Sequence, residues 1–462
     1  MPAFDPQQLA AWTGGRWTSA PSAVAGFCVD SRRTGEGQAF VALKTPKRDG
    51  HDFVAAAERS GAPAAIVERQ VPGAAVAQLV VADPLKALQA IARGHRTNFR
   101  GPVVGITGSA GKTSTKELLS VMLGGEGSGV LATSGNLNNH IGVALTLSRL
   151  DPALHSFAVV EAGISAPGEM SVLASMIAPD AALVTMVGPA HLEELGGLEG
   201  VAREKAVLPE ALSDKARAVF PGSCAAFGPF KSLEARGARV LERSPGPATP
   251  GRMTFTVSHS ATTTTITVGF RGESVPVDLR RVSDGMAQNA ALALVAALGL
   301  GVPADAVRRR IGSWIAAPLR GEWRIEPGRR LYLDCYNANP ASMADALAVF
   351  AEVAPANEPR TFLIGCMEEL GADRERYHLE LGRSIRLRPE DSLFVVGGLA
   401  GAVREGARLS GASDSQVTVS DSVDPLVERL GSLKGAIFVK GSRRHELERA
   451  FQGAGIAEAA HA

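Results

Sequence analysis

The chain has 462 residues, of which 45% are hydrophobic and 21% charged, and this length predicts about three domains, each large enough to bury a core. Its 48 Lys and Arg against 47 Asp and Glu leave a net charge of +1, which excludes a strongly basic nucleic-acid-binding protein. Four cysteines without a CxxC pair predict neither a disulfide framework nor a zinc site. Neither a signal peptide nor an apolar run of about 20 residues is recognisable, so we expect a cytoplasmic protein without membrane insertion.

The first predicted domain spans residues 1–99. Short strands are expected at residues 40–43 and 65–67, and a helix at residues 53–60. A second helix, at residues 85–95, leads out of this domain. The Arg100-Gly101-Pro102 tripeptide breaks regular structure and marks the boundary.

The second predicted domain spans residues 100–317. It begins with a buried strand, PVVGIT (102–107), followed by a Gly-rich loop and a helix at residues 113–123. Apolar runs recur at FAVVEAG (157–163) and ALVTMV (182–187), and strands alternating with helices predict a parallel sheet with helices on both faces. The SPGPATPG segment (244–251) reads as a loop before an antiparallel hairpin formed by MTFTV and TTTTITVGF, and an apolar helix is expected from Asn289.

The third predicted domain spans residues 318–462. Its four buried-strand candidates are LYLDCY (331–336), TFLIG (361–365), SLFVVGG (392–398) and AIFVKG (436–441), with helices such as residues 341–353 between them. This alternation is typical of a smaller, Rossmann-like domain. The fold class predicted for the whole chain is α/β with three domains and a central P-loop-type parallel sheet.

The strongest chemical signal is the segment GITGSAGKTSTKELL (105–119). Small residues let several backbone N–H groups point at one phosphate, and the N-terminus of the following helix adds partial positive charge. Lys112 can reach the β- and γ-phosphates, and the Thr113 hydroxyl can ligate Mg²⁺. The match is to a short form, T-G-x-x-G-K-T, because Ile106 stands where the general pattern has its first Gly. A strand before the loop and a helix after it favour phosphate binding over a chance Gly-rich turn. The predicted nucleotide contacts in this loop are Gly108, Ser109, Gly111, Lys112, Thr113 and Ser114.

Glu161 ends the apolar strand FAVVE. A carboxylate at the carboxyl end of a strand, beside a phosphate loop, is well placed to hold Mg²⁺. The alternative is an ordinary acidic residue at a strand end that faces water.

Five further motifs accompany the phosphate loop, and together the six occur along the chain in the order found in a known protein family. The motifs are SGNLNNHIGVALTL (134–147), EAG (161–163), AHLEELGGLEGVAREK (190–205), DCYNANPASM (334–343) and VKGSR (439–443). Over nearly the whole chain they resemble the Mur ligase family, the ATP-dependent amino-acid and peptide ligases of cell-wall synthesis. GNLNN, YNANPxSM and KGSR are most similar to the branch that joins D-alanyl-D-alanine to UDP-N-acetylmuramoyl-tripeptide. The N-terminal segment at residues 30–53 resembles that branch and also the preceding ligase, which forms the tripeptide. The resemblance implies ATP and Mg²⁺ as cofactors and a reaction through an acyl phosphate that yields the UDP-linked pentapeptide, ADP and phosphate.

The resemblance also implies a catalytic group around two Mg²⁺ ions. Lys112 would act on the ATP phosphates, Glu161 and Thr113 would ligate the first ion, and His191 would ligate the second. Lys205 would be carbamoylated by CO₂, which turns a cation into an oxygen ligand. Without the resemblance, His191 and Lys205 would read as a surface histidine and a solvated helix residue. The chain departs from the family's usual Gly-Glu after this lysine, with Ala206-Val207 instead.

Further residues take roles in nucleotide and substrate binding by the same resemblance. Asn289 is either an adenine contact or a helix cap, since SDGMAQN replaces the family's Gly-x-His-Asn lead-in. Each of these groups also has a purely structural interpretation. The asparagines of GNLNN could form an ordinary turn, and the residues proposed to contact UDP could form a polar turn. The residues of the third domain could form the corner between a strand, a loop and a helix. The remaining implied contacts are Arg320 and Asp334 to nucleotide; Asn136, Asn138 and Asn139 to substrate near the acyl phosphate; Asp30, Ser31 and Arg32 to UDP; Tyr336, Asn337 and Asn339 to the dipeptide or growing peptide; and Lys440, Ser442 and Arg443 to a phosphate or carboxylate.

Three other functions stay open from the sequence. The first is another Mur-type ligase, which would add a single amino acid such as the third residue of the peptide, or act on folate or cyanophycin. The second is a P-loop ATPase or kinase without an amine acceptor. The third is a non-catalytic nucleotide-binding scaffold, since Cys366 stands where the family often has an Asp. We expect a monomer with UDP-N-acetylmuramoyl-tripeptide and D-alanyl-D-alanine as its partners, and no nucleic acid.

Overall fold

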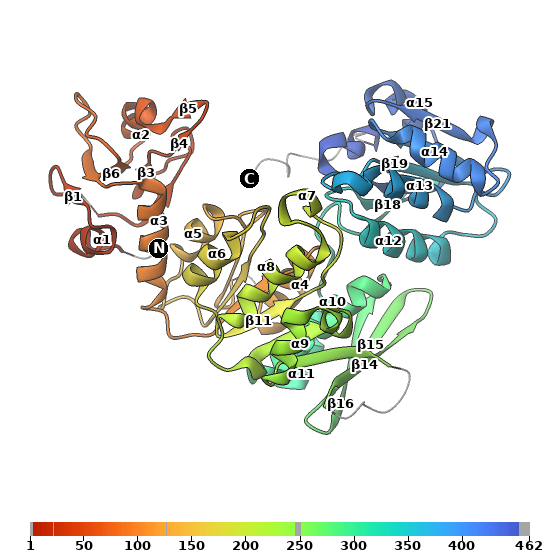
Figure 1. Cartoon of the computed structure of the whole chain (residues 1–462), viewed down its shortest axis with the longest axis horizontal. Helices are drawn as coiled ribbons and strands as arrows, with labels where there is room; N and C mark the ends of the chain where they lie inside the picture. Colours follow the sequence, from red (N-terminus) through yellow and green to blue (C-terminus); the bar gives the residue numbers. More distant parts are fainter. Residues whose placement is uncertain (1–2, 22, 126, 245–250, 452–462) are drawn as a thin grey trace.

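The computed structural model describes residues 3–21, 23–125, 127–244 and 251–451. These residues form three α/β domains in chain order, each built on its own sheet (Figure 1). In Figure 1 the first domain lies at the left, the last at the right, and the middle domain lies below and between them. The predicted fold class, three α/β domains with a largely parallel central sheet, is confirmed.

The first domain is a five-stranded sheet in the order β1-β7-β6-β3-β2, with a separate β4–β5 ribbon. All pairings within the five-stranded sheet are parallel except that of β1 with β7. Its elements are α1 (Pro6–Thr13), β1 (Arg16–Trp17), β2 (Gly26–Cys28), β3 (Gln38–Val41), β4 (Lys44–Thr45), β5 (Arg48–Asp49), α2 (Val54–Arg59), β6 (Ala64–Val67), β7 (Ala77–Val80) and α3 (Pro84–Arg96).

Helix α3 joins the first domain to the middle one. It begins at Pro84, where a missing N–H costs nothing, and the Asp83 carboxylate accepts from two N–H groups of its first turn. At its other end the buried Arg96 guanidinium donates to the Ile177 carbonyl at 3.0 Å and to the Asp180 carboxylate at 2.8 Å. Because a buried charge is retained only where its donors are satisfied, Arg96 fixes α3 against the middle domain.

The middle domain is a nine-stranded sheet in the order β16-β15-β14-β13-β12-β11-β8-β10-β9. In this sheet order the seven strands from β14 to β9, including β8, pair in parallel. Strands β15 and β16 continue the sheet as an antiparallel meander. The elements are β8 (Val103–Thr107), α4 (Lys112–Leu123), β9 (Val130–Ala132), α5 (Gly142–Leu147), β10 (Phe157–Glu161), α6 (Glu169–Ile177), β11 (Ala181–Val184), α7 (Leu192–Leu195), α8 (Leu198–Glu210), β12 (Ala218–Pro221), α9 (Gly228–Ala235), β13 (Arg239–Arg243), β14 (Met253–His259), β15 (Thr263–Phe270), β16 (Glu273–Arg280), α10 (Asp284–Gly299) and α11 (Ala304–Ile311).

Two features of this domain differ from the sequence-based expectation. The predicted hairpin of β14 and β15 is present, and a third strand, β16, extends it. Exposed and buried residues alternate along β16, but the sequence did not predict a strand here because Pro276 normally interrupts one. The predicted apolar helix begins at Asp284, five residues before Asn289, because Ser283 caps it. The central part of the predicted 244–251 loop, residues 245–250, lies outside the described residues.

The last domain is a six-stranded sheet in the order β17-β18-β22-β19-β20-β21. Among the strands described for residues 318–451, only β17 runs antiparallel to its neighbour. All four predicted strands are present, and β17 and β21 are additional edge strands with shorter or less apolar sequences. The elements are β17 (Glu322–Glu326), β18 (Arg329–Asp334), α12 (Pro340–Val353), β19 (Arg360–Gly365), α13 (Arg374–Ser384), β20 (Ser392–Val396), α14 (Ala400–Leu409), β21 (Val417–Ser420), α15 (Val427–Gly431) and β22 (Gly435–Lys440).

The carboxyl ends of the parallel strands decide where ligands can bind. Strands β8 and β11 are buried throughout, and β10 is buried after its first residue, because helices cover both faces of the sheet. Polar loops are therefore confined to the strand ends, where α/β sheets bind their ligands. In the middle domain these ends carry the Gly-rich loop and Glu161. In the last domain they carry Asp334 and Lys440.

Helices α13 and α14 pack against each other through two glycines, which yields a stability prediction. A Cβ added at Gly382 of α13 would lie 2.0 Å from the Val403 carbonyl oxygen, and one added at Gly406 of α14 would lie 2.1 Å from the Leu379 carbonyl oxygen. A Cβ added at Gly401, also on α14, would meet nothing within 4 Å. We expect Gly382→Ala to lower the free energy of unfolding by about 1–3 kcal/mol through overpacking. The control Gly401→Ala is expected to leave it unchanged or raise it by up to about 1 kcal/mol. Urea unfolding followed by circular dichroism measures both, and equal effects of the two variants would contradict this packing.

Across the described ranges, no helix combines the length and the apolar character needed to span a bilayer. All four cysteines are described, and each is a free thiol.

Candidate active site between the middle and last domains

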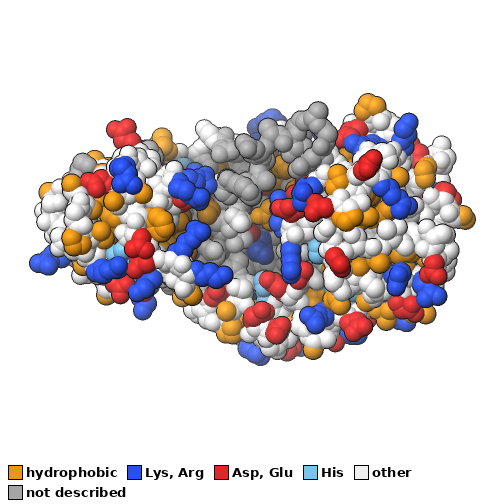
Figure 2. All heavy atoms as spheres, turned by 90° about the horizontal axis from the view of Figure 1, so that it is seen from above, with side chains coloured by type: hydrophobic (Ala, Val, Ile, Leu, Met, Phe, Trp, Pro, Cys, Tyr) orange, Lys and Arg blue, Asp and Glu red, His pale blue; other side chains and the backbone are white. Residues whose placement is uncertain are grey.

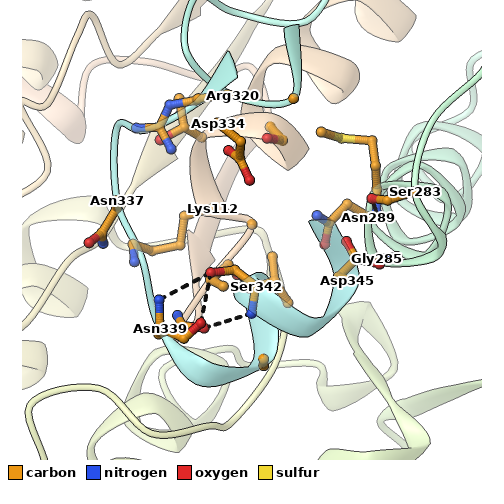
Figure 3. Close-up of a pocket in the computed structure, with 18 of the residues that line it drawn as sticks. Lys112, Ser283, Gly285, Asn289, Arg320, Asp334, Asn337, Asn339, Ser342 and Asp345 are labelled. Carbon is orange, nitrogen blue, oxygen red and sulfur yellow. Dashed lines mark hydrogen bonds between the residues drawn. The ribbon is translucent and has the colours of Figure 1, made fainter. Parts of the chain in front are cut away.

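A cavity of about 330 Å³ lies between the middle and last domains (Figure 3). Its walls come from the Gly-rich loop and the start of α10 on one side and from the β17–α12 region on the other. The lining residues are Ser109, Ala110, Gly111, Lys112, Thr113, Ser114, Asn138, Glu161, Thr185, Met186, Ser283, Gly285, Met286, Gln288, Asn289, Arg320, Gly321, Tyr332, Asp334, Tyr336, Asn337, Asn339, Ala341, Ser342, Asp345 and Lys440.

The Gly-rich loop has the geometry of a phosphate cradle. Gly108 and Gly111 have φ values of 150° and 81°, which glycine adopts without strain. A Cβ at Gly108 would come within 1.8 Å of the Thr185 hydroxyl, and one at Gly111 within 2.5 Å of the Asn289 amide. The loop is closed further by Ser109, whose hydroxyl donates to the Gly188 carbonyl at 2.9 Å and accepts from the Gly188 N–H at 3.0 Å. The Ser109 side chain therefore shapes the loop.

Lys112 is the first residue of α4 and reaches back over the loop. Its ammonium donates to the Gly108 carbonyl at 2.8 Å. Burial lowers the pKa of Lys112, the nearby Glu161 carboxylate opposes this, and the positive charge of Arg320 adds to it. An anion in the cavity would relieve the burial of this cation and the repulsion from Arg320, so the site favours a polyanionic ligand.

Thr113, Asn138 and Glu161 form one hydrogen-bonded group at the floor of the cavity. The Glu161 carboxylate, 1% exposed, accepts from the Thr113 hydroxyl at 2.9 Å and from the Asn138 amide at 2.8 Å. Asn138 packs over Gly163 of the EAG motif, where a Cβ would lie 2.9 Å from the amide carbon. Strand-end Glu161 therefore faces the phosphate loop and not water.

Lys205 is a buried lysine of α8, and only 2% of its surface is exposed. Its ammonium has no side-chain hydrogen bond or ion pair among the described residues. Burial and the positive charge of Lys112 hold the pKa of Lys205 well below its ordinary value. Lys116 is equally buried but behaves differently, since its ammonium donates to the Thr133 carbonyl at 2.7 Å and pairs with Glu117 at 2.6 Å. Lys205 is therefore an unpaired amine beside the phosphate loop.

The opposite wall of the cavity belongs to the last domain. The Lys440 ammonium lies 2.5 Å from the Asp334 carboxylate, and the Arg320 guanidinium stacks on the Tyr336 ring at 3.9 Å from its centre. Asn339 caps α12 by accepting from the Ser342 N–H at 2.9 Å, and its amide also donates to the Ser109 carbonyl at 3.4 Å. The same asparagine thus begins a helix of one domain and touches the phosphate loop of the other.

Asn289 is not the helix cap. The Ser283 hydroxyl accepts from the Met286 N–H at 3.2 Å and caps α10, while Asn289 lies inside the helix with its amide against Gly111. Figure 3 shows Asn289, Ser283 and Gly285 on the side of the cavity opposite Asn337 and Asn339. Of the two interpretations of Asn289, only a ligand or loop contact is compatible with this position.

Several residues predicted from the sequence do not line this cavity. Asn139 caps the turn before α5 by accepting from the Gly142 N–H at 2.8 Å, and Asn136 is exposed. Arg443 pairs with the buried Glu448, and Ser442 lies beside it outside the cavity lining. His191 lies at the junction of the two domains, with Nδ1 2.6 Å from the Glu369 carboxylate.

Asp30, Ser31 and Arg32 lie in the first domain, after β2. Arg32 binds the Asp30 carboxylate in bidentate fashion at 2.9 and 2.7 Å, and this pairing lowers the pKa of Asp30 to about 2. The three residues are remote from the cavity lining.

Other residues of the site were not predicted from the sequence. Thr185 follows the end of β11, a strand-end position that could have been recognised. Asp345 accepts from the Gly285 N–H at 2.8 Å across the domain junction, and Glu369 contacts His191; neither carries a local sequence signal. Within the described ranges, no group of three His, Cys, Asp or Glu side chains is arranged to hold a metal ion, so a metal here needs other oxygen ligands.

Models of three family domains match the chain. The Mur ligase family catalytic domain matches residues 24–96, the Mur ligase middle domain matches residues 106–297, and the Mur ligase glutamate ligase domain matches residues 320–443.

Named relatives and solved structures agree with these matches. The UDP-N-acetylmuramoyl-tripeptide--D-alanyl-D-alanine ligase of Escherichia coli K12 is 33% identical over 426 residues, covering 91% of each chain. A crystal structure of MurF from Acinetobacter baumannii superposes with a TM-score of 0.85 at 28% identity, covering 97% of this chain and 98% of the other. MurF from Thermotoga maritima in complex with ADP superposes with a TM-score of 0.76 at 27% identity, covering 92% and 96%. The chain belongs to the Mur ligase family.

Proposed function

We propose that this protein is the ligase that joins D-alanyl-D-alanine to UDP-N-acetylmuramoyl-tripeptide at the expense of ATP, in the synthesis of peptidoglycan precursors. The terminal carboxylate of the tripeptide attacks the γ-phosphate of ATP and forms an acyl phosphate with release of ADP. The amine of D-alanyl-D-alanine then attacks the acyl carbon and releases phosphate. Both steps gather negative charge, so positioning and electrostatic stabilisation account for the catalysis.

The observation that carries the proposal is the shared cavity. It brings a phosphate loop with Lys112 into one space with the last domain's Asp334, Asn337 and Lys440. An ATPase needs only a nucleotide site, whereas a ligase also needs a second polar wall to hold an amine beside the activated carboxyl. The relatives and structures named above as D-alanyl-D-alanine ligases, at about 30% identity over nine tenths of the chain, favour that dipeptide over a single amino acid.

The donors present suit Mg²⁺. Thr113 and Glu161 supply a hydroxyl and a carboxylate 2.9 Å apart, hard oxygen ligands that hold Mg²⁺ together with phosphate oxygens of a bound nucleotide. A second ion would need anionic oxygen at Lys205, and a buried, unpaired amine with a lowered pKa is the form of lysine that reacts with CO₂ to give a carbamate. His191 completes this proposed set. Bound Mg²⁺ would neutralise charge on the transferring phosphoryl group.

The remaining site residues have proposed roles that follow from their positions. Arg320, Asp334 and Asn289 contact the nucleotide, and Asn138 orients substrate beside Glu161. Tyr336, Asn337, Asn339 and Lys440 form the wall that faces the incoming dipeptide. Residues Asn136, Asn139, Ser442 and Arg443 lie outside the cavity lining, so we propose that they shape its rim or contact substrate beyond it.

For the UDP moiety we propose the first domain, with Asp30, Ser31 and Arg32 as contacts. Arg32 is 84% exposed and Arg33 is also exposed, and the space-filling view shows Lys and Arg side chains gathered on this domain (Figure 2). A pyrophosphate suits such exposed cations.

Release of ADP by the purified protein tests the function. We expect turnover only with ATP, UDP-N-acetylmuramoyl-tripeptide and D-alanyl-D-alanine together, measured by coupled ADP detection and by mass spectrometry of the pentapeptide. Lysine or meso-diaminopimelate with the UDP-linked dipeptide serves as the control for a ligase that adds the third residue. Turnover with that pair, or ADP release without any amine, would contradict the proposal.

The location, assembly and domain limits are also proposals. Dependence on ATP and four free cysteines favour the cytoplasm. We propose a monomer whose domains divide at residues 1–99, 100–317 and 318–462.

A further inference from the structure

Two loops from different domains meet beside the proposed active site. One precedes α7 in the middle domain and ends at His191; the other follows β19 in the last domain and contains Glu369. The Glu369 carboxylate lies 2.6 Å from Nδ1 of His191, and the Glu369 carbonyl accepts from the Leu192 N–H at 3.3 Å. A Cβ added at Gly371 would lie 3.5 Å from the Glu193 nitrogen, so the two loops touch over several residues.

Both residues of this contact have an unfavourable backbone conformation. Six non-glycine residues of the described ranges have a positive φ, and two of the six are His191, at 53°, and Glu369, at 61°. The left-handed region costs such residues roughly 1–2 kcal/mol each. Strain of this kind persists mainly where function requires it. Two such residues face each other across this domain junction, which points to a functional role for the contact between them.

The contact distinguishes the two nitrogens of the imidazole. Nδ1 is buried and faces Glu369 without the alignment of a hydrogen bond, and Nε2 has no partner among the described residues. In catalytic sites such contacts often align only when the ligands are bound. A carboxylate on one ring nitrogen fixes the proton there and leaves the other nitrogen as an acceptor or metal ligand.

We propose that Glu369 is a positioning residue that orients His191 from the opposite domain. This inference rests on the proposed ligase function, in which His191 acts near the transferring phosphate. Because His191 belongs to the middle domain and Glu369 to the last, the imidazole is held in its active orientation only while the two domains are docked. The contact therefore makes completion of the active site conditional on docking of the last domain, which supplies the dipeptide wall.

A purely stabilising ion pair is the competing explanation. The side chains are 27% and 54% exposed, and pairs this exposed contribute at most about 1 kcal/mol to stability. The neighbouring Glu368 offers a matched control: it carries the same side chain on the same loop, but its nearest cation is Arg444 at 3.7 Å. A stabilising role predicts similar small effects for both glutamates, whereas positioning of His191 concerns Glu369 alone.

The kinetic test compares Glu369→Ala, Glu369→Gln and Glu368→Ala in the full-length enzyme with ATP and both peptide substrates. We expect Glu369→Ala to lower kcat by about 10–100-fold with little change in the KM for ATP. Glu369→Gln keeps an oxygen that accepts from Nδ1 and recovers most of this loss, and Glu368→Ala behaves as the wild type. His191→Ala combined with Glu369→Ala should be no slower than His191→Ala alone, because Glu369 acts through the imidazole.

A second readout needs neither metal nor turnover. Selective ¹⁵N labelling of the nine histidines, with His191 assigned by its Ala variant, reports which ring nitrogen carries the proton. We expect the proton on Nδ1 in the wild type and in Glu368→Ala, and a shift toward Nε2 in Glu369→Ala. An unchanged tautomer, additive kinetic losses, or equal effects at Glu368 and Glu369 would overturn the inference. Absence of turnover in the wild type would instead refute the ligase function.

Discussion

Replacing Lys112 with alanine is expected to lower kcat for ADP release by about 10²–10³-fold. The lysine begins α4, donates to the Gly108 carbonyl at 2.8 Å, and presents a cation in the cavity in which we propose that phosphoryl transfer gathers negative charge. Its loss removes one preorganised charge and leaves Arg320 and Lys440 in place. Coupled ADP detection at saturating substrates measures the effect, and nucleotide affinity should also fall.

The fold is expected to survive this change, since the Lys112 side chain makes one hydrogen bond to the protein. Circular dichroism and the midpoint of thermal unfolding verify this. Lys231→Ala, an exposed lysine of α9 on the same domain, is the matched control and should keep wild-type turnover. A Lys112→Ala enzyme with normal kcat would mean that the cavity is not where ATP reacts.

The second large effect is expected at Lys205. We predict that Lys205→Ala lowers kcat by at least about 10²-fold and that added formate or acetate restores part of it by supplying the missing anionic oxygens. The physical reason is the environment of the amine: it is buried and unpaired, and burial together with the positive charge of Lys112 lowers its pKa, which favours the neutral form that reacts with CO₂. A carbamate at this position converts a charge that repels Mg²⁺ into one that binds it.

Incubation with ¹³C-bicarbonate gives a direct measurement, because a lysine carbamate has its own carbon resonance. We expect the signal in the wild type and in Lys231→Ala, and its loss in Lys205→Ala. Lys116 should remain unmodified, since its ammonium is held by the Thr133 carbonyl and Glu117. A signal that survives in Lys205→Ala would place the carbamate elsewhere, and failure of carboxylates to restore turnover would argue against its role.

The sequence predicted those parts of the site that depend on local signals. The phosphate loop combines small residues, a Lys-Thr pair, a strand before it and a helix after it, and all of these lie within the 22 residues 102–123. Glu161 and Asp334 could be predicted because each ends a buried strand. The number of strands in the last domain was underestimated, since edge strands such as β17 alternate polar and apolar residues and bury little.

The contacts between domains could not be predicted in this way. Glu368 and Glu369 are identical neighbours, and only the direction of the loop decides which of them reaches His191. The roles of the asparagines could not be predicted from the sequence either, because the same amide can cap a helix or bind a ligand. In the structure Asn139 caps the turn before α5, and Asn138 donates to the Glu161 carboxylate. Asn339 caps α12 and also donates to the Ser109 carbonyl of the phosphate loop.

Since the proposed nucleotide cavity has one wall from each of two domains, the affinity measured for ATP would depend on the fraction of molecules in which the two walls are assembled. If the assembled arrangement held about a tenth of the population, the apparent dissociation constant for ATP would be roughly tenfold weaker than the intrinsic one. A substitution at the interface between the two domains, even far from the nucleotide, would thus lower the apparent affinity for ATP without removing a contact to it. Conversely, a small molecule that contacts both walls would stabilise the assembled arrangement of the two domains and would slow the release of ADP after the reaction.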